Sequence, residues 1–241
     1  MSFGYRPTWA EVNLNNLEYN FCRIKESLSP GVKIMVTVKA DAYGHGLVPV
    51  ARRLSSLKVD FFGVASIDEG IALRKAGIRT PILILGLILK KDISPLFEYG
   101  LSTTVCDIEL PRVLDSMSRK SGKRANVHIK VDTGMGRIGV HPYNAHKLIK
   151  SINRFKYINI EGVFTHFAFA DINKKFTYYQ IGLFEDLISR LQKEGIKAKF
   201  MHAANSMGLL DYKRSHFNMV RPGLITYGLY PRKDICIKLK P

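Results

Sequence analysis

The 241-residue sequence is poor in cysteine and has no long apolar run. Its three cysteines, Cys22, Cys106 and Cys236, are widely spaced and odd in number, which argues against a disulfide framework and against a metal site built on paired cysteines. The longest apolar run, PILILGLIL at residues 81–89, is too short to cross a membrane. The amino terminus, MSFGYRPTWAEV, lacks the apolar segment of a secretory signal. We therefore expect a cytoplasmic protein without a metal ion.

Acidic residues are also scarce, because 20 Asp and Glu face 37 Lys and Arg, a net charge of +17. This excess predicts non-specific binding to polyanions at low salt. The basic residues cluster at most in pairs such as Arg52-Arg53, and no helix-turn-helix, finger or stacking-aromatic motif accompanies them. A solvated basic surface is favoured over a nucleic-acid groove, which stays open as the alternative.

Several catalytic signatures are absent. The sequence contains no HExxH, CxxC, GxSxG, GxGxxG or P-loop motif, so metal hydrolysis, serine chemistry and nucleoside-phosphate binding have no direct support. Hydrophobic residues make up 46% and charged residues 24%, as in ordinary globular proteins. The length suits one large α/β domain or two small ones.

Short β-like runs alternate with amphipathic helical segments along the whole chain. This alternation predicts βαβ units and a parallel sheet. Eight candidate strands favour a closed (β/α)8 barrel of the TIM type over an open doubly wound sheet. In one βα connection, Ser66 followed by Glu69 predicts a capping box that opens a helix ended by Gly77. The expected strands are residues 34–38, 60–65, 81–85, 102–105, 126–131, 159–165, 199–202 and 218–221.

Polar residues gather directly after the expected strands. The carboxyl ends of barrel strands share one face, where active sites lie, so we expect these residues to form one site. They are Lys39, Asp132-Thr133-Gly134, His166, His202 with Asn205-Ser206, and Arg221.

The chemistry of these residues suggests an amine nucleophile and an anionic ligand. Partial burial of Lys39 at the end of a strand lowers the pKa of its amine, as a Schiff-base lysine requires. Arg137 and Arg221 can hold a carboxylate or a phosphate but cannot act as bases. The glycine turns at residues 134–136 and 222–223 let backbone N–H groups approach a phosphate. The composite predicts a phosphate-bearing ligand.

Each of these residues also has a structural alternative. Lys39 alone would be a solvated lysine, and His166 alone a hydrogen-bonded core histidine. Residues 132–137 could be only a strand-to-helix connection. Asn205-Ser206 could only cap a helix, and Arg221 could be a solvated residue before Pro222.

The joint order of these segments resembles alanine racemase, specifically its amino-terminal pyridoxal-phosphate barrel. The resemblance extends from RPTWAEVNLNNLEYN to the end of the sequence, and it implies a fold-type III (β/α)8 barrel over residues 1–230. Residues 231–241 would be a linker or the first strand of a carboxy-terminal β domain. The specific segments are VKADAYGHG, ASIDEGIALRKAGI, HIKVDTGMGRIG, GVFTHFAFAD, HAANS and MVRPGLITYG.

The resemblance implies a role for each residue of the site. Lys39 would form the internal aldimine with pyridoxal 5'-phosphate and act as the base on one face of the substrate α-carbon. Arg221, supported by His166, would contact the pyridine nitrogen. Arg137 would bind the cofactor's phenolic oxygen and the substrate carboxylate. The remaining implied residues are Tyr43, Ser206, Gly223 and Leu224 at the phosphate, Asn205 lining the site, and Lys130 as a lysine that can carry a carbamate.

The implied function is the interconversion of L-alanine and D-alanine, which supplies D-alanine for the cell wall. The family works as a homodimer, and a tyrosine of the partner's carboxy-terminal domain is the second base. The sequence stops at CIKLKP, where that domain would begin, so we expect a truncated and impaired racemase. A barrel-only pyridoxal-phosphate-binding protein without racemase turnover is the alternative. We expect neither a membrane nor a specific nucleic-acid partner.

Overall fold

Eight parallel strands close into a barrel in chain order, from β1 to β8 and back to β1. The computed structural model describes residues 8–241, and residues 1–7 of the predicted barrel domain lie outside it. The predicted (β/α)8 barrel is confirmed, and each strand boundary lies within one residue of its expected place. The strands are β1 (Lys33–Thr37), β2 (Phe61–Val64), β3 (Ile82–Ile84), β4 (Ser102–Val105), β5 (Ala125–Lys130), β6 (Ile158–Phe164), β7 (Phe200–His202) and β8 (Met219–Val220).

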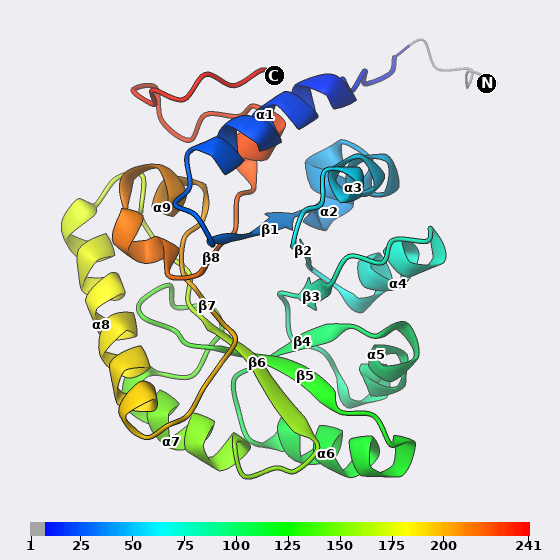
Figure 1. The fold of residues 1–241 in the computed structure, drawn as a ribbon, viewed down its shortest axis with the longest axis vertical. Helices are drawn as coiled ribbons and strands as arrows, with labels where there is room; N and C mark the ends of the chain where they lie inside the picture. Colours follow the sequence, from blue (N-terminus) through cyan, green and yellow to red (C-terminus); the bar gives the residue numbers. More distant parts are fainter. Residues whose placement is uncertain (1–7) are drawn as a thin grey trace.

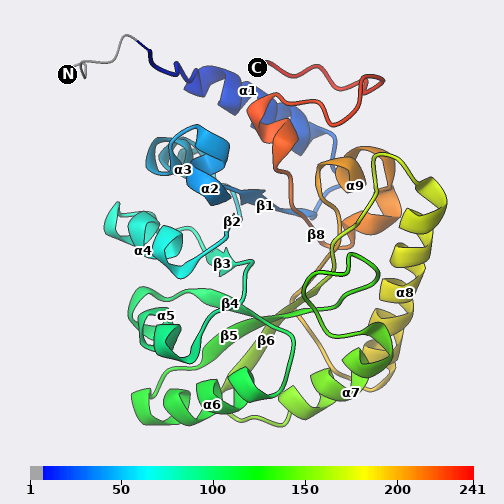
Figure 2. The same cartoon turned by 180° about the vertical axis from the view of Figure 1, so that it is seen from behind.

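The helices surround the strands in chain order (Figures 1 and 2). The sequence did not predict α5 and α7, and α8 begins five residues before its expected start at residue 179. None of the helices within residues 8–241 is long and apolar enough to span a membrane. The helices are α1 (Leu14–Glu26), α2 (Lys39–Gly44), α3 (Leu47–Ser56), α4 (Ile67–Lys75), α5 (Ile93–Tyr99), α6 (Glu109–Ser121), α7 (Pro142–Ile152), α8 (Lys174–Lys193) and α9 (Ser206–Asp211), with short 3-10 turns η1 (Lys90–Asp92), η2 (Lys213–His216) and η3 (Leu224–Tyr227).

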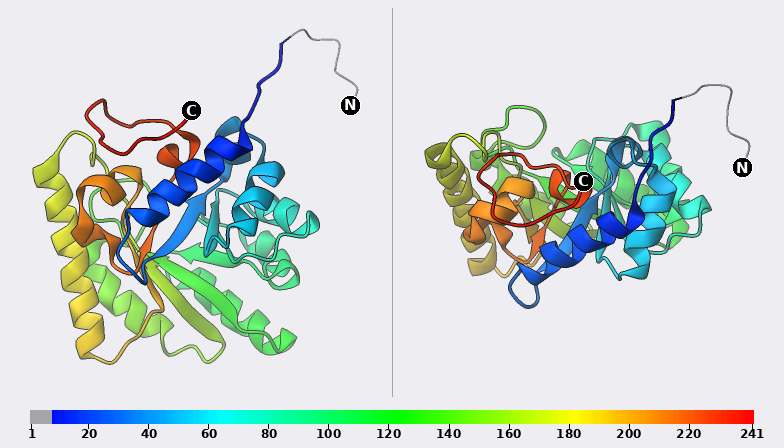
Figure 3. Two further views of the ribbon diagram at one scale, coloured as in Figure 1. Left: turned by 45° about the horizontal axis from the view of Figure 1, so that its top comes forward. Right: turned by 90° about the horizontal axis from the view of Figure 1, so that it is seen from above.

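Helix α1 completes the outer ring, although it precedes the first strand. It packs between η3 and α3, where a helix following β8 would lie. The carboxy-terminal segment runs beside α1 (Figure 3). The Asn20 amide donates to the carbonyl of Lys240 at 2.7 Å and accepts from the Lys240 N–H at 2.7 Å. Within this chain residues 231–241 form no strand, and their assignment to a linker or to a further domain stays a prediction.

The barrel interior is apolar on one side and polar on the other. Side chains from β1, β2, β3, β7 and β8 form the apolar side, and the polar side comes from β4, β5, β6 and the last residue of β7. On the polar side, Glu161 accepts hydrogen bonds from the Ser102 hydroxyl at 2.6 Å and from His128 at 3.1 Å. The apolar side chains are Met35, Phe61, Leu83, Phe200 and Met219.

A bulge between β5 and β6 makes room for the His128 ring. Val127 pairs with Ile160 whereas His128 pairs with Gly162, so Glu161 is the extra residue. A Cβ at Gly162 would collide with the His128 imidazole. Glycine at this position therefore allows a histidine to lie inside the barrel.

We expect Gly162→Ala to lower the free energy of unfolding by about 1–3 kcal/mol, because a methyl group there overpacks the interior. Urea unfolding measures this change. Gly182 lies inside α8 with open space around it, so Gly182→Ala is the matched control and should raise stability by about 0.5–1 kcal/mol. Equal stability of Gly162→Ala and the unsubstituted protein would contradict the packing described.

Candidate functional site

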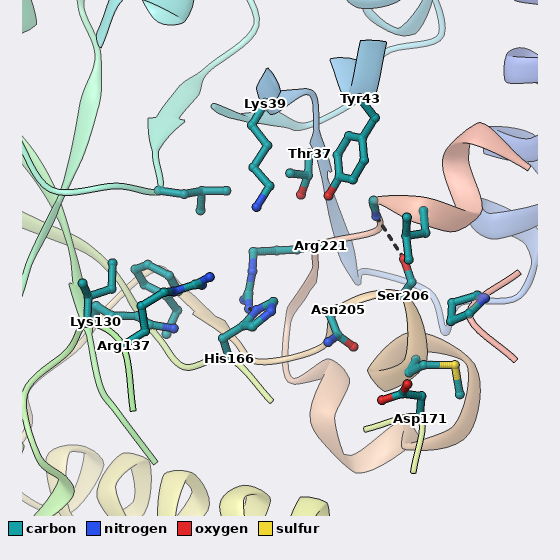
Figure 4. Close-up of a pocket in the computed structure, with 17 residues that line it drawn as sticks. Thr37, Lys39, Tyr43, Lys130, Arg137, His166, Asp171, Asn205, Ser206 and Arg221 are labelled. Carbon is teal, nitrogen blue, oxygen red and sulfur yellow. Dashed lines mark hydrogen bonds between the residues drawn. The ribbon is translucent and has the colours of Figure 1, made fainter. Parts of the chain in front are cut away.

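A cavity of about 280 Å³ opens at the carboxyl ends of the strands, close to the lower end of the range for small-molecule sites, about 300–1,000 Å³. Asp132, Thr133, Gly134 and His202, which were also expected at this site, do not line the cavity. The other site residues predicted from the sequence do line it (Figure 4). They are Lys39, Tyr43, Lys130, Arg137, His166, Asn205, Ser206, Arg221, Gly223 and Leu224.

The sequence did not identify seven further lining residues. Thr37 and Phe164 are the last residues of β1 and β6, and Leu85 directly follows β3. Their positions at strand ends are a signal that could have identified them as lining residues. Their uncharged side chains do not by themselves indicate a functional role. The other four are Ile138, Asp171, Met207 and Pro231.

Lys39 begins α2, a left-handed turn that follows β1. The four residues Ala40–Tyr43 have φ between 52° and 56°, a conformation that costs non-glycine residues roughly 1–2 kcal/mol each. The turn closes on itself, because Ala42 donates to the Val38 carbonyl at 2.8 Å and Leu47 donates to the Asp41 carboxylate at 2.6 Å.

Lys39 itself is half-buried. Burial, and then the nearby Arg137 guanidinium, lower the pKa of its amine, while Glu69 acts in the opposite direction. A lowered pKa increases the neutral, nucleophilic fraction of the amine. Lys39 is therefore suited to covalent chemistry rather than to a solvated position.

Tyr43, Ser206 and Gly223 form a cradle at one end of the cavity. The Ser206 hydroxyl accepts the Gly223 N–H at 3.1 Å (Figure 4). A Cβ at Gly223 would lie 2.7 Å from the Tyr43 hydroxyl, so glycine lets this hydroxyl approach the backbone closely. Asn205 caps α9 by accepting the Gly208 N–H at 2.9 Å. Asn205 is thus both a helix cap and a lining residue.

The second glycine turn does not face a ligand, which corrects the expectation for residues 134–136. The N–H groups of Gly134, Met135 and Gly136 all donate to the Asp132 carboxylate, at 2.8–3.1 Å. Asp132 follows β5 and draws the turn around itself, so these amides cannot cradle a phosphate. The cradle belongs to the Gly223 turn alone of the two predicted turns.

Cations dominate the cavity wall: Lys39, Lys130, Arg137 and Arg221 face a single lining carboxylate, Asp171. Lys130 is 3% exposed, and its Nζ lies 4.7 Å from the centre of the Phe164 ring. Burial, and then Arg221 and Arg137, hold the pKa of Lys130 well below its usual value. An anionic ligand would relieve this concentration of positive charge.

Arg221 is buried, and not the solvated residue that its place before Pro222 allowed. It is 4% exposed and donates to the carbonyls of Thr165 at 2.6 Å and Ala203 at 3.0 Å. It also donates to His202 Nδ1 at 2.7 Å, and its Nη2 lies 3.5 Å from His166 Nδ1. Burial lowers the pKa of Arg221 to about 9, which leaves the guanidinium charged at neutral pH.

His202 lies behind Arg221 inside the barrel, and not on the cavity wall. An arginine only donates, so His202 Nδ1 accepts and the ring proton is on Nε2. That proton faces His128 Nδ1 at 2.9 Å, and His128 Nε2 in turn faces Glu161 at 3.1 Å. The chain of hydrogen bonds thus fixes both tautomers and connects the cavity to the barrel interior.

We expect the protein to lose stability as the pH falls from 7 to about 5. Burial lowers the pKa values of His128, His166 and His202 below the usual 6.5. In this window the unfolded chain binds protons that the folded protein does not, and each histidine contributes up to about 1.4 kcal/mol per pH unit. The midpoint of urea unfolding, measured over the pH series, reports the change.

A midpoint independent of pH over this window would contradict a neutral state of the three histidines in the folded protein. The control is His141→Asn, at an exposed histidine before α7. It should leave the pH dependence of the midpoint unchanged.

Comparison with known proteins agrees with this geometry. The chain is 45% identical to an alanine racemase of Halothermothrix orenii over 239 residues, which cover 98% of this chain and 63% of that protein. It is 44% identical to the alanine racemase of Treponema denticola, over 98% of this chain and 64% of the relative. The chain therefore spans less than two thirds of the length of these relatives.

Solved structures give the same result. The alanine racemase of Clostridium difficile 630, determined in complex with cycloserine, superposes with a TM-score of 0.95 at 40% identity, covering 98% of this chain and 66% of that one. The model of the family described as alanine racemase, N-terminal domain, matches residues 12–231. The chain therefore belongs to the alanine racemase N-terminal domain family.

Proposed function

We propose that the cavity binds pyridoxal 5'-phosphate and serves the interconversion of L-alanine and D-alanine. The observation that carries the proposal is that an amine with a lowered pKa, Lys39, lines the same cavity as the cradle of Tyr43, Ser206 and Gly223 and the buried cations Lys130 and Arg221. The names of the relatives support the reaction.

The residues present fit this cofactor. The Tyr43 hydroxyl, its close approach to the Gly223 backbone, and the Ser206 hydroxyl suit a phosphate. The cationic wall compensates a dianion together with a substrate carboxylate. Lys39 is the half-buried amine that a Schiff base needs.

Each residue then has an assigned place. Tyr43, Ser206 and the backbone at Gly223 and Leu224 would hold the phosphate, with Asn205 lining the site. Arg221 would face the pyridine nitrogen, and Arg137 the phenolic oxygen. When bound, the cofactor supplies an electron sink for negative charge at the substrate α-carbon.

The protein's own groups handle the protons. Lys39 Nζ, when neutral, removes the α-proton on its side of the substrate and can return it. Arg221 keeps its own proton, because its pKa of about 9 lies far above that of a pyridine. Arg221 would therefore hydrogen-bond the ring nitrogen of the bound cofactor without protonating it. The cofactor would then supply a weaker electron sink, which suits racemisation better than side reactions.

Lys130 is proposed to carry a carbamate. Its pKa is held well below the usual value by burial and two arginines, so its neutral form can add to carbon dioxide, forming an N–C bond and releasing one proton to solvent. The product would replace a buried amine by an anion beside Arg137 and Arg221. That exchange of charge suits a wall that has few carboxylates.

The acid/base for the opposite face is proposed to come from outside these 241 residues. Among residues 8–241, Tyr43 is the one tyrosine that lines the cavity, and it belongs to the phosphate end. In keeping with the family, we place the second base on a partner subunit of a homodimer, and the enzyme in the cytoplasm, where it supplies D-alanine for peptidoglycan. A pyridoxal-phosphate-binding protein without turnover remains the second candidate.

Addition of pyridoxal 5'-phosphate followed by borohydride should fix the cofactor on Lys39, because the pKa of this amine is lowered and the amine lines the cavity. Mass spectrometry of the digested protein locates the adduct. Lys39→Ala should lose it, whereas Lys150→Ala, at an exposed lysine of α7, should keep it. An adduct retained at full yield in Lys39→Ala would disprove the cofactor assignment.

With the cofactor bound, the 241-residue protein should exchange the α-hydrogen of D-alanine for deuterium and form little L-alanine, since Lys39 serves one face only. Mass spectrometry and chiral chromatography measure the two quantities. Rapid conversion of D-alanine to L-alanine would show that the second base is within this chain. Absence of any exchange would favour the binding protein over the racemase.

A further inference from the structure

The turn that carries Lys39 needs support from outside itself. Ala40, Asp41, Ala42 and Tyr43 are consecutive non-glycine residues with positive φ. Each is sterically disfavoured in this conformation, and such a run persists only where its surroundings over-determine it. Most of the turn's hydrogen bonds are internal to residues 38–47, such as the one from Gly46 to the Asp41 carbonyl at 3.0 Å.

Glu69 supplies the external support. Its Oε1 accepts the Ala40 N–H at 2.6 Å, and its Oε2 accepts the Ala65 N–H at 2.7 Å. Ala40 directly follows Lys39, and Ala65 directly follows β2. Among the residues from 8 to 241, this carboxylate is the link between the backbone of Ala40–Tyr43 and the neighbouring βα unit. One carboxylate oxygen thus accepts the N–H of the residue after Lys39, and the other accepts the N–H of the residue after β2.

This use of Glu69 departs from the capping box that the sequence predicts. Ser66 does accept the Glu69 N–H, at 3.4 Å. In a capping box the Glu69 carboxylate would return to the Ser66 N–H, but here it bonds Ala65 and Ala40 instead. Helix α4 thus lacks the second hydrogen bond of a capping box, because the Glu69 carboxylate bonds the Lys39 turn and Ala65 instead.

We propose that Glu69 is a positioning residue that fixes the Lys39 turn against the end of β2, so that the Lys39 amine enters the cavity in its reactive orientation. The inference rests on the proposed function in one respect, because it assumes that Lys39 is the residue that attaches the cofactor. Glu69 does not line the cavity, and it acts through Lys39.

The loss of the Glu69 charge and the loss of its hydrogen bonds should change the rate of cofactor attachment in opposite directions in Glu69→Gln. The negative charge of Glu69 favours the ammonium form of Lys39, so removing it should increase the neutral amine and speed covalent attachment. Loss of position should slow attachment, because glutamine cannot accept both N–H groups. We expect the positional effect to exceed the charge effect.

The experiment measures the rate at which pyridoxal 5'-phosphate attaches to Lys39, from the visible absorbance and from borohydride trapping over a pH series. The amine condenses with the aldehyde and one water is released. At high pH, where Lys39 is neutral in both proteins, attachment to Glu69→Gln should be slower by about tenfold or more. Asp68→Asn removes an exposed carboxylate from the same turn of α4 and should match the unsubstituted protein.

A second measurement needs no cofactor. Hydrogen exchange at the Ala40 amide should be faster by about tenfold in Glu69→Gln, since a hydrogen bond to a charged acceptor is lost, and unchanged in Asp68→Asn. Glu69→Asp keeps the charge with a shorter reach, so it should hold one N–H group and attach the cofactor at an intermediate rate. It also serves if Glu69→Gln fails to fold.

The outcomes separate this inference from the proposed function. Attachment in Glu69→Gln as fast as in the unsubstituted protein, or equally slow in Asp68→Asn, overturns the positioning role. If the unsubstituted protein attaches no cofactor, the proposed function fails. The Ala40 amide then decides the role of Glu69, and unchanged exchange in Glu69→Gln overturns it.

Discussion

The burial of the Arg221 guanidinium sets the polar architecture of this barrel. A buried charge that only donates hydrogen bonds requires acceptors on every side. The carbonyls of Thr165 and Ala203 and the Nδ1 of His202 supply them. His202 then needs His128, and His128 needs Glu161. The polar half of the interior, and the glycine at position 162 that makes room for it, follow from this one charge.

The same charge shapes the cavity. After the effect of burial itself, Arg221 and Arg137 hold the pKa values of Lys130 and His166 low, and Arg137 lowers the pKa of Lys39. A wall of cations with one carboxylate is costly unless an anion completes it. The scarcity of acidic residues in the sequence is also found at this site. The phosphate and the carboxylate proposed to bind here would balance the positive charge of the wall.

Much of the fold could be predicted from the sequence, because strand periodicity is local. The strands at residues 102–105 and 126–131 are marked by alternating or β-branched residues between turns, and the structure has them in place. Helix α5, with seven residues and a proline, has too little periodicity to be seen. The left-handed turn at Ala40–Tyr43 has no local signal either, since alanine and aspartate prefer other conformations, and tertiary contacts hold it.

The site divides in the same way. The sequence by itself determined the residue types and their order after the strands, and Lys39, Arg221 and the Gly223 turn could be identified because a barrel brings strand ends to one face. Tertiary structure alone decided which of two glycine turns lines the cavity. Asp132 accepts the amides of the first turn, whereas Gly223 of the second lines the cavity beside Tyr43 and Ser206. Tertiary structure also decided that Glu69 bonds Ala40 and not Ser66. Which backbone amide a carboxylate bonds depends on distances in the folded protein, and the order of residues in the sequence does not give these distances.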